Sequence, residues 1–248
     1  MTAPRWAYGV TTVPMRLTTT LPDTLLSLKA AGFDRPRLFV DGATHADVGS
    51  FMERYGEDNV TVRFPRIRAY GNWILALAEL YIRNPECARY AIFQDDFVTY
   101  PCLRTYLDAC PYPDRGYWNL YTFPSNQKLC PKGGDGKDWI GWYKSNQFGR
   151  GAVALVFNQE AVQILLSHQH MVMRAADVNR GWHIIDGAVV DTMRQSSWTE
   201  YVHNPSLTQH TGHVSAIGHK PQKQAPSFQG EAWSALNLMP HARKAHGT

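Results

Sequence analysis

Short apolar runs alternate with amphipathic stretches along the first half of the chain. The runs are rich in β-branched and aromatic residues and have the length of buried strands. We expect strands at residues 6–12, 37–42, 60–64 and 90–94. Helices are expected at residues 21–32, where leucines recur at helical spacing, and at the strongly apolar residues 72–82. This alternation predicts an α/β fold with a mostly parallel, Rossmann-like central sheet flanked by helices.

The second half of the chain has a less regular pattern of apolar runs. Strand-like and helix-like runs recur at residues 118–123, 152–157, 159–166, 184–193 and 198–203. Between the first two of these runs, residues 124–148 are rich in Gly, Lys and aromatic side chains. A connection of this length predicts a lid, a binding loop or a disordered segment.

Two adjacent carboxylates, Asp95 and Asp96, directly follow the apolar run at residues 90–94. In an open α/β sheet, ligands bind beyond the carboxyl ends of the strands. Adjacent carboxylates suit a hard divalent cation, which takes oxygen ligands and is often shared with substrate phosphates. The pattern therefore predicts a metal and phosphate site, and an Asp-rich turn is the structural alternative.

Other polar residues also stand at the ends of expected strands. Thr11 and Thr12 close the first strand, Arg16 lies in the loop that leaves it, and Asp41 ends the second. If the strands are parallel neighbours, hydroxyl groups and acids surround one crevice, which suits a nucleotide with Arg16 on its phosphates. We assign Asn72 to the same nucleotide-binding set. Neither GxGxxG nor GxxxxGK[ST] occurs, so the dinucleotide and P-loop modes lack their fingerprints.

An acid and a histidine in the second half are further candidates. Asp186 stands just before an apolar run, where a helix dipole would keep a general base ionised; a plain N-cap is the alternative. The expected loop at residues 205–213 carries two histidines. One of them, His210, is a candidate imidazole ligand for a metal at Asp96, and a surface histidine is the alternative.

Aromatic and basic side chains are interleaved near the end of the long expected loop. Trp139, Trp142 and Tyr143 stand among lysines, and Arg150 follows them. Such a pattern can stack on and neutralise a nucleic-acid or sugar acceptor, although a merely solvated loop has the same composition.

Composition places the chain among ordinary globular proteins. Of its 248 residues, 44% are hydrophobic and 19% are charged, which is enough to bury a sizeable core. No apolar run approaches the roughly 18 residues that span a bilayer, and no signal-peptide core follows Met1. We therefore expect a cytoplasmic protein with no membrane partner. The four cysteines show no CxxC or zinc-type spacing and are expected to be buried free thiols.

The net charge of +4 lies mostly near the end of the chain. From residue 217 onward, four basic side chains stand against one acidic side chain. We expect residues 220–248 to form a basic extension, either wrapped on the domain or partly disordered. Clustered basic charge of this kind can recruit polyanions, and a solvated tail is the alternative.

Taken together, four features in sequence order resemble the glycosyltransferases of the GT-A fold. They are a strand and loop at residues 8–16, the DxD-type element Gln94-Asp95-Asp96, the pre-helix acid Asp186, and the string Pro-Ser-Leu-x-Gln-His-x-Gly at residues 205–212. The string resembles N-acetylglucosaminyltransferase-IV-type enzymes and the glycosyltransferases that accompany TET/JBP-type base hydroxylases in phages. The latter are thought to glycosylate hydroxymethylated pyrimidines in DNA. The resemblance covers residues 6–219, and Gln94 departs from a strict DxD.

The resemblance implies a role for each part of the chain. A single GT-A domain would occupy residues 1–219, with a nucleotide-sugar half at 1–123 and an acceptor half at 124–219. Asp96 and His210 would bind Mn²⁺ or Mg²⁺, and Asp95 would contact the ribose or the metal. The nucleotide would be held by Thr11, Arg16 and Asp41. Asp186 would be the base of an inverting displacement.

The resulting expectation is a metal-dependent hexosyltransferase, with UDP-glucose as donor and a 5-hydroxymethylpyrimidine in DNA as acceptor. It would act in the cytoplasm of a bacterial or phage-infected cell, with no obligate protein partner evident. Trp139, Trp142 and Tyr143 would stack against a base that has left the helix. A glycan or protein acceptor is the first alternative. A non-catalytic nucleotide or nucleic-acid binding module, and a nuclease or phosphatase that uses the same carboxylates, are the others.

Overall fold

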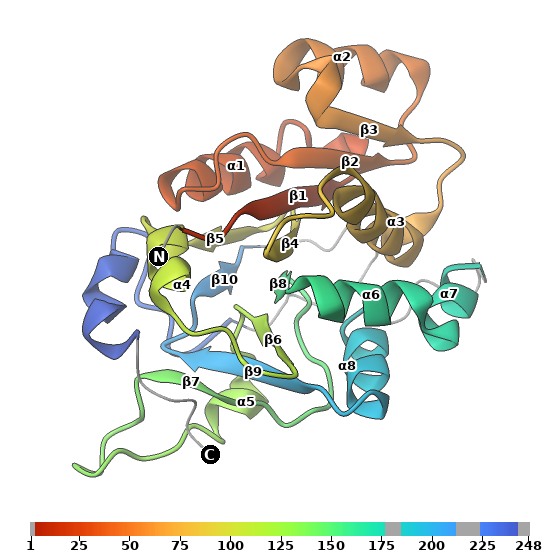
Figure 1. The fold of residues 1–248 in the computed structure, drawn as a ribbon. Helices are drawn as coiled ribbons and strands as arrows, with labels where there is room; N and C mark the ends of the chain where they lie inside the picture. Colours follow the sequence, from red (N-terminus) through yellow and green to blue (C-terminus); the bar gives the residue numbers. More distant parts are fainter. Residues whose placement is uncertain (1–2, 177–184, 212–223, 243–248) are drawn as a thin grey trace.

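The computed structural model describes residues 3–176, 185–211 and 224–242, and within them an eight-stranded sheet crosses the centre of the molecule (Figure 1). Its strand order is β3-β2-β1-β4-β8-β6-β9-β7. The strands are β1 (Trp6–Thr12), β2 (Arg37–Asp41), β3 (Val60–Arg63), β4 (Arg89–Gln94), β6 (Gly116–Asn119), β7 (Gly141–Lys144), β8 (Ala154–Phe157) and β9 (Thr199–Asn204).

The sheet is mixed, although most of its strands run in one direction. β3, β2, β1 and β4 are parallel neighbours, as expected from the alternation of strands and helices, and β6 is parallel to β9. β8 runs antiparallel to both β4 and β6, and β7 runs antiparallel to β9. The segments that lead from β6 to β7 and from β7 to β8 carry no long helix, unlike the connections between the parallel strands β1, β2, β3 and β4. The predicted α/β class is confirmed, and the two reversed strands lie in the second half.

Helices cover both faces of the sheet (Figure 1). α1 and α4 pack on one face, and α3, α6, α7 and α8 pack on the other. The helices are α1 (Thr20–Ala30), α2 (His45–Tyr55), α3 (Arg68–Arg83), α4 (Leu103–Ala109), α5 (Pro124–Gln127), α6 (Gln159–Ser167), α7 (Gln169–Ala176) and α8 (Ile185–Gln195), with 3-10 turns η1 (Pro14–Arg16), η2 (Glu57–Asn59) and η3 (Ala235–His241). Within the described residues, none of these helices has the length and apolar character needed to cross a membrane.

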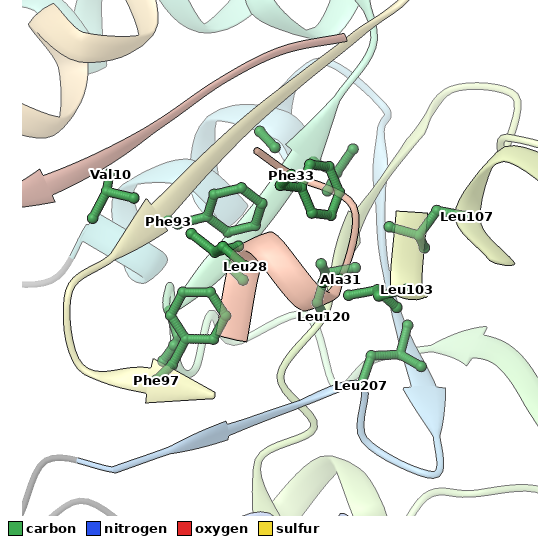
Figure 2. Close-up of a cluster of buried hydrophobic side chains, with 14 of the residues drawn as sticks. Val10, Leu28, Ala31, Phe33, Phe93, Phe97, Leu103, Leu107, Leu120 and Leu207 are labelled. Carbon is green, nitrogen blue, oxygen red and sulfur yellow. The ribbon is translucent and has the colours of Figure 1, made fainter. Parts of the chain in front are cut away.

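Alternation along the strands decides which core each side chain joins. Val10, Leu38 and Phe93 belong to the cluster under α1, and Phe39 and Ile92 belong to the cluster under α3. In the first cluster, Phe93 lies between two other aromatic rings (Figure 2). Its centroid is 5.2 Å from that of Phe33, edge to face, and 5.6 Å from that of Phe97, stacked. This packing fixes the end of β4, where Asp95 follows.

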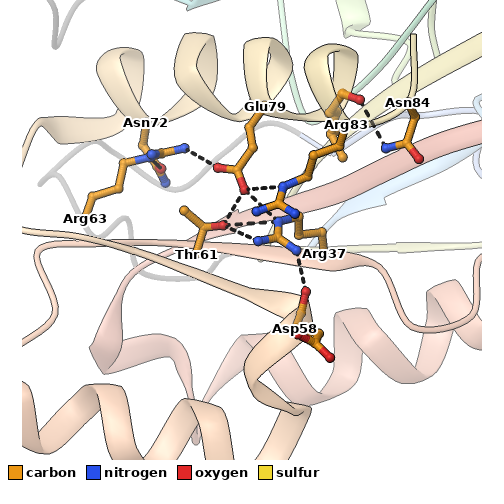
Figure 3. A network of polar contacts seen from close by, with 9 residues as sticks. Arg37, Asp58, Thr61, Arg63, Asn72, Glu79, Arg83 and Asn84 are labelled. Atoms are coloured by element: carbon orange, nitrogen blue, oxygen red, sulfur yellow. Dashed lines mark hydrogen bonds and ion pairs between the residues drawn. The ribbon is translucent and has the colours of Figure 1, made fainter.

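A polar network ties α3 to the edge strands β2 and β3 (Figure 3). Glu79 on α3 accepts hydrogen bonds from Arg37 Nε at 2.9 Å and from Thr61 Oγ1 at 2.7 Å. Arg63 Nη2 lies 3.5 Å from the other oxygen of Glu79. Because both arginines are mostly buried, the shared carboxylate offsets the cost of removing their charges from water.

Two segments that were predicted to be loops contain strands. Residues 124–148 include the short helix α5 and the edge strand β7. Residues 205–213 include β10 (Thr208–His210), which pairs antiparallel with β5 (Phe97–Thr99) in a separate two-stranded sheet. β7 and β10 have only four and three residues, too few for their alternation to stand out against the surrounding Gly, Lys and Pro.

The described part of the C-terminal extension, residues 224–242, packs on the domain. Ala235 and Leu238 are buried in the same cluster as the sheet. The ring of Phe228 stacks on Tyr100, with centroids 4.7 Å apart. This part is wrapped on the domain, as one of the two alternatives proposed. The tail residues that carry its basic excess, Lys220, Lys223, Arg243 and Lys244, lie outside the described residues.

Gly9, in the middle of β1, is a position where a side chain would break the packing. A Cβ there would lie 2.5 Å from the Phe39 ring and 2.7 Å from the Arg37 carbonyl oxygen. We expect Gly9→Ala to lower the free energy of unfolding by about 1–3 kcal/mol, measured by urea denaturation. Gly49→Ala on α2 is the control, since a Cβ there meets nothing within 4 Å and Ala is favoured in a helix. Equal stability of Gly9→Ala and wild type would contradict the packing described.

Candidate active site

The carboxyl ends of three parallel strands meet at one edge of the sheet. β1 ends at Thr12, β2 ends at Asp41, and β4 ends at Gln94, directly before Asp95. The register sets Thr11 opposite Gln94, so the ends of β1 and β4 are level. As a result, Thr12 Oγ1 donates a hydrogen bond of 2.5 Å to Asp95 Oδ2. One hydroxyl and one acid of the predicted set are therefore in contact at this edge.

Asp96 lies between two side chains that come from distant parts of the sequence. Its Oδ2 is 3.5 Å from Arg16 Nη2, and its Oδ1 is 3.4 Å from His210 Nε2. All three residues are buried. Arg16 belongs to η1, and its Nη1 donates to Thr20 Oγ1 at 2.8 Å, which anchors the guanidinium.

His210 is brought to this edge by the two-stranded sheet. In that sheet His210 stands opposite Phe97, and the Thr211 amide donates to the Asp96 carbonyl oxygen at 2.8 Å. Thr24 on α1 donates to the Phe97 carbonyl oxygen at 2.9 Å and so ties β5 to the domain. Two strands too short to be evident from the sequence therefore hold the imidazole beside the carboxylate.

Burial dominates the electrostatics of these side chains. Loss of water raises the pKa of Asp95 to about 7, and the charge of Asp96 adds to the rise, while Thr12 and Arg16 oppose it. Burial likewise raises the pKa of Asp96, against the effect of Arg16. Burial and the Arg16 charge lower the pKa of His210 to about 4, so its imidazole is neutral at pH 7.

The donor set fits a divalent cation that is shared with a ligand. Asp96 Oδ1 is buried and has no hydrogen-bond partner among the described residues, and His210 faces it as a neutral imidazole, the form that binds metals. Within the described ranges no three His, Cys, Asp or Glu side chains gather as a metal site. Asp95 directs one oxygen to Thr12 instead. The protein itself thus offers two ligands, and a bound diphosphate would have to supply others.

Asp186 lies at the start of α8 against a glycine-containing loop. Its Oδ2 accepts a hydrogen bond of 2.7 Å from the Gly151 amide, and its Oδ1 accepts one of 3.1 Å from the Gly187 amide. A Cβ on Gly149, whose φ is +63°, would lie 2.3 Å from the Asp186 carbonyl oxygen, so only glycine fits this approach. Burial raises the pKa of Asp186, and the two amides and the charge of Arg150 partly offset the rise.

Gln94 connects this loop to the acidic pair. Its side-chain amide donates to the Ala152 carbonyl oxygen at 2.8 Å, and its backbone amide donates to the Val153 carbonyl oxygen at 2.8 Å. Ala152 follows Gly151, which holds Asp186. The departure from a strict DxD therefore has a structural reason, because a glutamine at this position bonds to the loop through its amide.

The remaining predicted nucleotide ligands make mainly internal contacts. The Thr11 hydroxyl donates to the Phe93 carbonyl oxygen at 3.3 Å. Asn72 donates to the Phe39 carbonyl oxygen at 2.8 Å and accepts from Arg63 at 2.9 Å, so both ends of its amide bind protein groups. Asp41 Oδ1 accepts from the Ile67 amide at 2.8 Å, and its Oδ2 lies 3.6 Å from Arg66 Nε. Asn72 thus links β2, β3 and α3, and its contact with a nucleotide stays a prediction.

The predicted acceptor residues divide into buried and exposed groups. Trp142 is 3% exposed and stacks on Trp118 at 4.6 Å, and Tyr143 is 1% exposed. The two side chains alternate on β7 and are buried on opposite faces, where the Tyr143 hydroxyl donates to the Asn126 carbonyl oxygen at 3.0 Å. This burial corrects their assignment to an acceptor-stacking surface. Trp139 is partly buried, and Arg150 is exposed beside the loop that holds Asp186.

Two residues beside Asp186 were not predicted from the sequence. Phe148 is 72% exposed, in the same loop as Gly149 and Arg150. Glu200 on β9 is 1% exposed, and the charge of Asp186 contributes to its raised pKa of about 6, after burial. A charged residue at an inward position of an otherwise alternating strand, 199–204, was the available signal for Glu200.

Comparison with known proteins leaves the family open. No protein-family model matches the chain, and no curated protein matches it. Solved structures resemble it distantly. One, a mannose-1-phosphate geranyltransferase from Thermus thermophilus, is 14% identical over 79% of this chain and 73% of that one, with a TM-score of 0.45. A putative glucose-1-phosphate thymidylyltransferase from Bacillus anthracis is 10% identical over 86% and 92%, with a TM-score of 0.43. A197 from STIV is 14% identical over 92% and 97%, with a TM-score of 0.41. At these scores the likeness does not bear on function.

The raised pKa of Asp95 predicts how stability changes with pH. Its folded-state pKa of about 7 lies above the ordinary 3.8, so the folded state binds this proton more tightly than the unfolded chain. The free energy of unfolding should therefore fall as pH rises from about 4 to about 7, by at most about 1.4 kcal/mol per pH unit for this group. Asp95→Asn should reduce this fall in urea denaturation without divalent metal, whereas Asp34→Asn, at an exposed position, should not. An unaltered slope in Asp95→Asn would mean that Asp95 is already ionised near pH 5.

Proposed function

We propose that this protein is a metal-dependent inverting glycosyltransferase that moves a hexose, with UDP-glucose as the first donor to test, to a hydroxyl group. The observation that carries the proposal is the arrangement of Asp96 and His210, 3.4 Å apart at the carboxyl edge of the parallel strands. Asp186 is held at the same edge through the Gly151 amide. The resemblance of the surrounding sequence motifs to GT-A glycosyltransferases supports the same assignment.

The donor would lie across the ends of β1, β2 and β4. Arg16 places a positive charge 3.5 Å from Asp96, where diphosphate charge would be received. Asp95 and Asp41 offer carboxylates for ribose hydroxyls or the base. Bound between Asp96 and His210, Mn²⁺ or Mg²⁺ would act as a Lewis acid that stabilises the departing diphosphate.

Asp186 would act as the general base. Its carboxylate would take the proton of the acceptor hydroxyl while the acceptor oxygen bonds to the anomeric carbon and the bond from that carbon to the diphosphate oxygen breaks. The two backbone amides at Gly151 and Gly187 fix the carboxylate oxygens before the acceptor arrives. Burial raises the pKa of Asp186 above its ordinary value and so makes it a stronger base than a solvated aspartate.

A 5-hydroxymethylpyrimidine in DNA is the proposed acceptor. Arg150 and Phe148 stand exposed on the loop beside Asp186, and the Arg150 guanidinium lies 6.0 Å from the centre of the Phe123 ring. A combination of a cation and aromatic rings suits a base and its phosphate. Binding through phosphate contacts predicts activity that falls steeply with salt. A glycan or protein acceptor is the second candidate, because Phe148 can also pack on the face of a sugar.

The decisive experiment is a panel of nucleotide sugars, each incubated with Mn²⁺ and hydroxymethylcytosine-containing DNA, followed by mass analysis of the nucleosides. A hexosyl adduct supports the proposal. Donor hydrolysis without an adduct on DNA points to another acceptor, and a glycan panel then follows. Donor binding with neither hydrolysis nor transfer points to a non-catalytic binding module, and nicked DNA or released phosphate points to a nuclease or phosphatase.

Asp186→Asn tests the general base. We expect turnover to fall by about 10² to 10⁴-fold with little change in donor affinity, because general-base assistance is typically of that size and Asp186 is not among the residues proposed to hold the donor. Steady-state kinetics and calorimetric titration of the donor measure the two quantities. Asp191→Asn, on the same helix and partly exposed, is the matched control. Undiminished turnover in Asp186→Asn would remove Asp186 from this role.

Asp96→Asn and His210→Ala test the metal site. Each should weaken UDP-glucose binding in the presence of Mn²⁺ by about tenfold or more, and EDTA should abolish the difference from wild type. Calorimetric titration with and without EDTA gives the affinities. His45→Ala, at an exposed position on α2, should bind like the wild type. Wild-type affinity that is the same with Mn²⁺ and with EDTA would count against a metal at this position.

A further inference from the structure

Glu200 is a buried acid that the proposed chemistry does not use. Its side chain on β9 is 1% exposed, and its Oε1 accepts hydrogen bonds of 3.2 Å from the Tyr117 hydroxyl and from Asn119 Nδ2. Among the described residues no lysine or arginine compensates its charge. A glutamine would fill the same volume without the cost of burying an ion. Packing alone does not explain a buried carboxylate at this position, which points to a role of its charge.

The main chain of Glu200 anchors the loop of residues 145–151. β7 ends at Lys144, and the Ser145 amide still donates to the Glu200 carbonyl oxygen at 3.0 Å. The side-chain amide of Gln147 then takes the place of a strand residue. Its Nε2 donates to the Glu200 carbonyl oxygen at 2.9 Å, and its Oε1 accepts from the Glu200 amide at 3.0 Å. The first part of the loop is thus fastened to this one residue of β9.

The carboxylate of Glu200 fastens the second part of the loop through Asn119. Asn119 Nδ2 is shared between Glu200 Oε1 at 3.2 Å and the Arg150 carbonyl oxygen at 3.1 Å. Its Oδ1 accepts from the Tyr121 amide at 3.1 Å. An ionised carboxylate can only accept hydrogen bonds, so it fixes which end of the Asn119 amide faces Arg150. The same planar peptide group carries the Gly151 amide that binds Asp186.

We propose that Glu200 is the positioning residue of this loop: it fixes Asn119, Asn119 holds the Arg150 carbonyl, and the Gly151 amide in turn holds the Asp186 carboxylate in place. The loop has little freedom to find this position by itself. Gln147, Gly149 and Gly151 all have positive φ, at +57°, +63° and +76°, an uncommon backbone path that the surrounding contacts must maintain. The consequence for catalysis rests on the proposed role of Asp186, whereas the hold on the loop does not.

The first measurement is amide hydrogen exchange of the peptide that covers residues 145–152, at pH 8. Glu200→Gln should exchange about tenfold faster in this peptide while the rest of the sheet stays protected. Gln147→Ala removes the side-chain hydrogen bonds between Gln147 and the main chain of Glu200, at a less buried position, and should increase exchange in the same peptide. The positioning role can therefore still be tested if Glu200→Gln does not fold. Glu79→Gln is the matched control, an acid-to-amide change in the polar network of α3 (Figure 3), which should leave the loop unchanged.

The second measurement separates positioning from general structure. Glu200→Gln should lower kcat about tenfold and leave the donor KM unchanged. In an Asp186→Asn background it should cause no further loss, because its effect passes through Asp186. Unchanged loop exchange in both Glu200→Gln and Gln147→Ala, or an equal loss of kcat in both backgrounds, would overturn the proposal.

A separate outcome concerns the proposed function. If the wild-type protein transfers sugar from no donor to any acceptor, the glycosyltransferase assignment has failed, and hydrogen exchange still decides the positioning role. Asp186→Asn and Glu200→Gln should then each open the peptide of residues 145–152, and the double variant should open it no further. Additive opening would show that the two residues hold the loop independently and would refute the chain of contacts proposed here.

Discussion

The site depends on one constraint, the burial of two adjacent carboxylates where a central strand ends. Asp95 and Asp96 are each 8% exposed, and two like charges so close together raise the cost of ionising either one. Neighbouring polar side chains offset part of this cost. Thr12 donates to Asp95, and Arg16 and His210 approach Asp96. The groups come from η1, from the end of β1 and from β10, so the position of each element is tied to the acidic pair.

The second half of the site is built on hydrogen bonds to backbone groups. Gln94 bonds the carbonyl oxygen of Ala152, the residue after Gly151, and the Gly151 amide bonds Asp186. Glu200 bonds the first part of this loop directly and the second part through Asn119. Backbone amides are rigid donors whose direction is set by the chain, so a carboxylate held in this way is already oriented before any ligand arrives. The acidic pair and the candidate base therefore belong to one connected arrangement, although they are far apart in sequence.

The sequence predicted the parts of this arrangement that follow from periodicity. The range 6–12 is that of β1, and the ends of β1, β2 and β4 carry the polar residues that the pattern placed there. The pattern failed where tertiary contacts decide the outcome. β10 has only three residues and forms because it pairs with β5, which is distant in the sequence. The residues around β10 therefore do not reveal this pairing. Trp142 was assigned to an acceptor surface by composition, but its alternation on β7 turns it into the core.

The same electrostatics bear on how a donor and a metal would bind together. Arg16 already occupies one side of Asp96, and His210 is held neutral, so the protein offers a cation one charged oxygen ligand and one uncharged nitrogen ligand. A hard divalent cation prefers six or more ligands, mostly oxygen, and gains most of them here only when a diphosphate is present. A bound cation would in turn add to the positive charge that Arg16 places beside Asp96, and so would favour a diphosphate. On the proposed function, each would therefore improve the site for the other, and the coupling would be reciprocal by thermodynamic necessity. On the proposed function, this coupling would let two protein ligands serve at a position where a self-contained metal centre would need more.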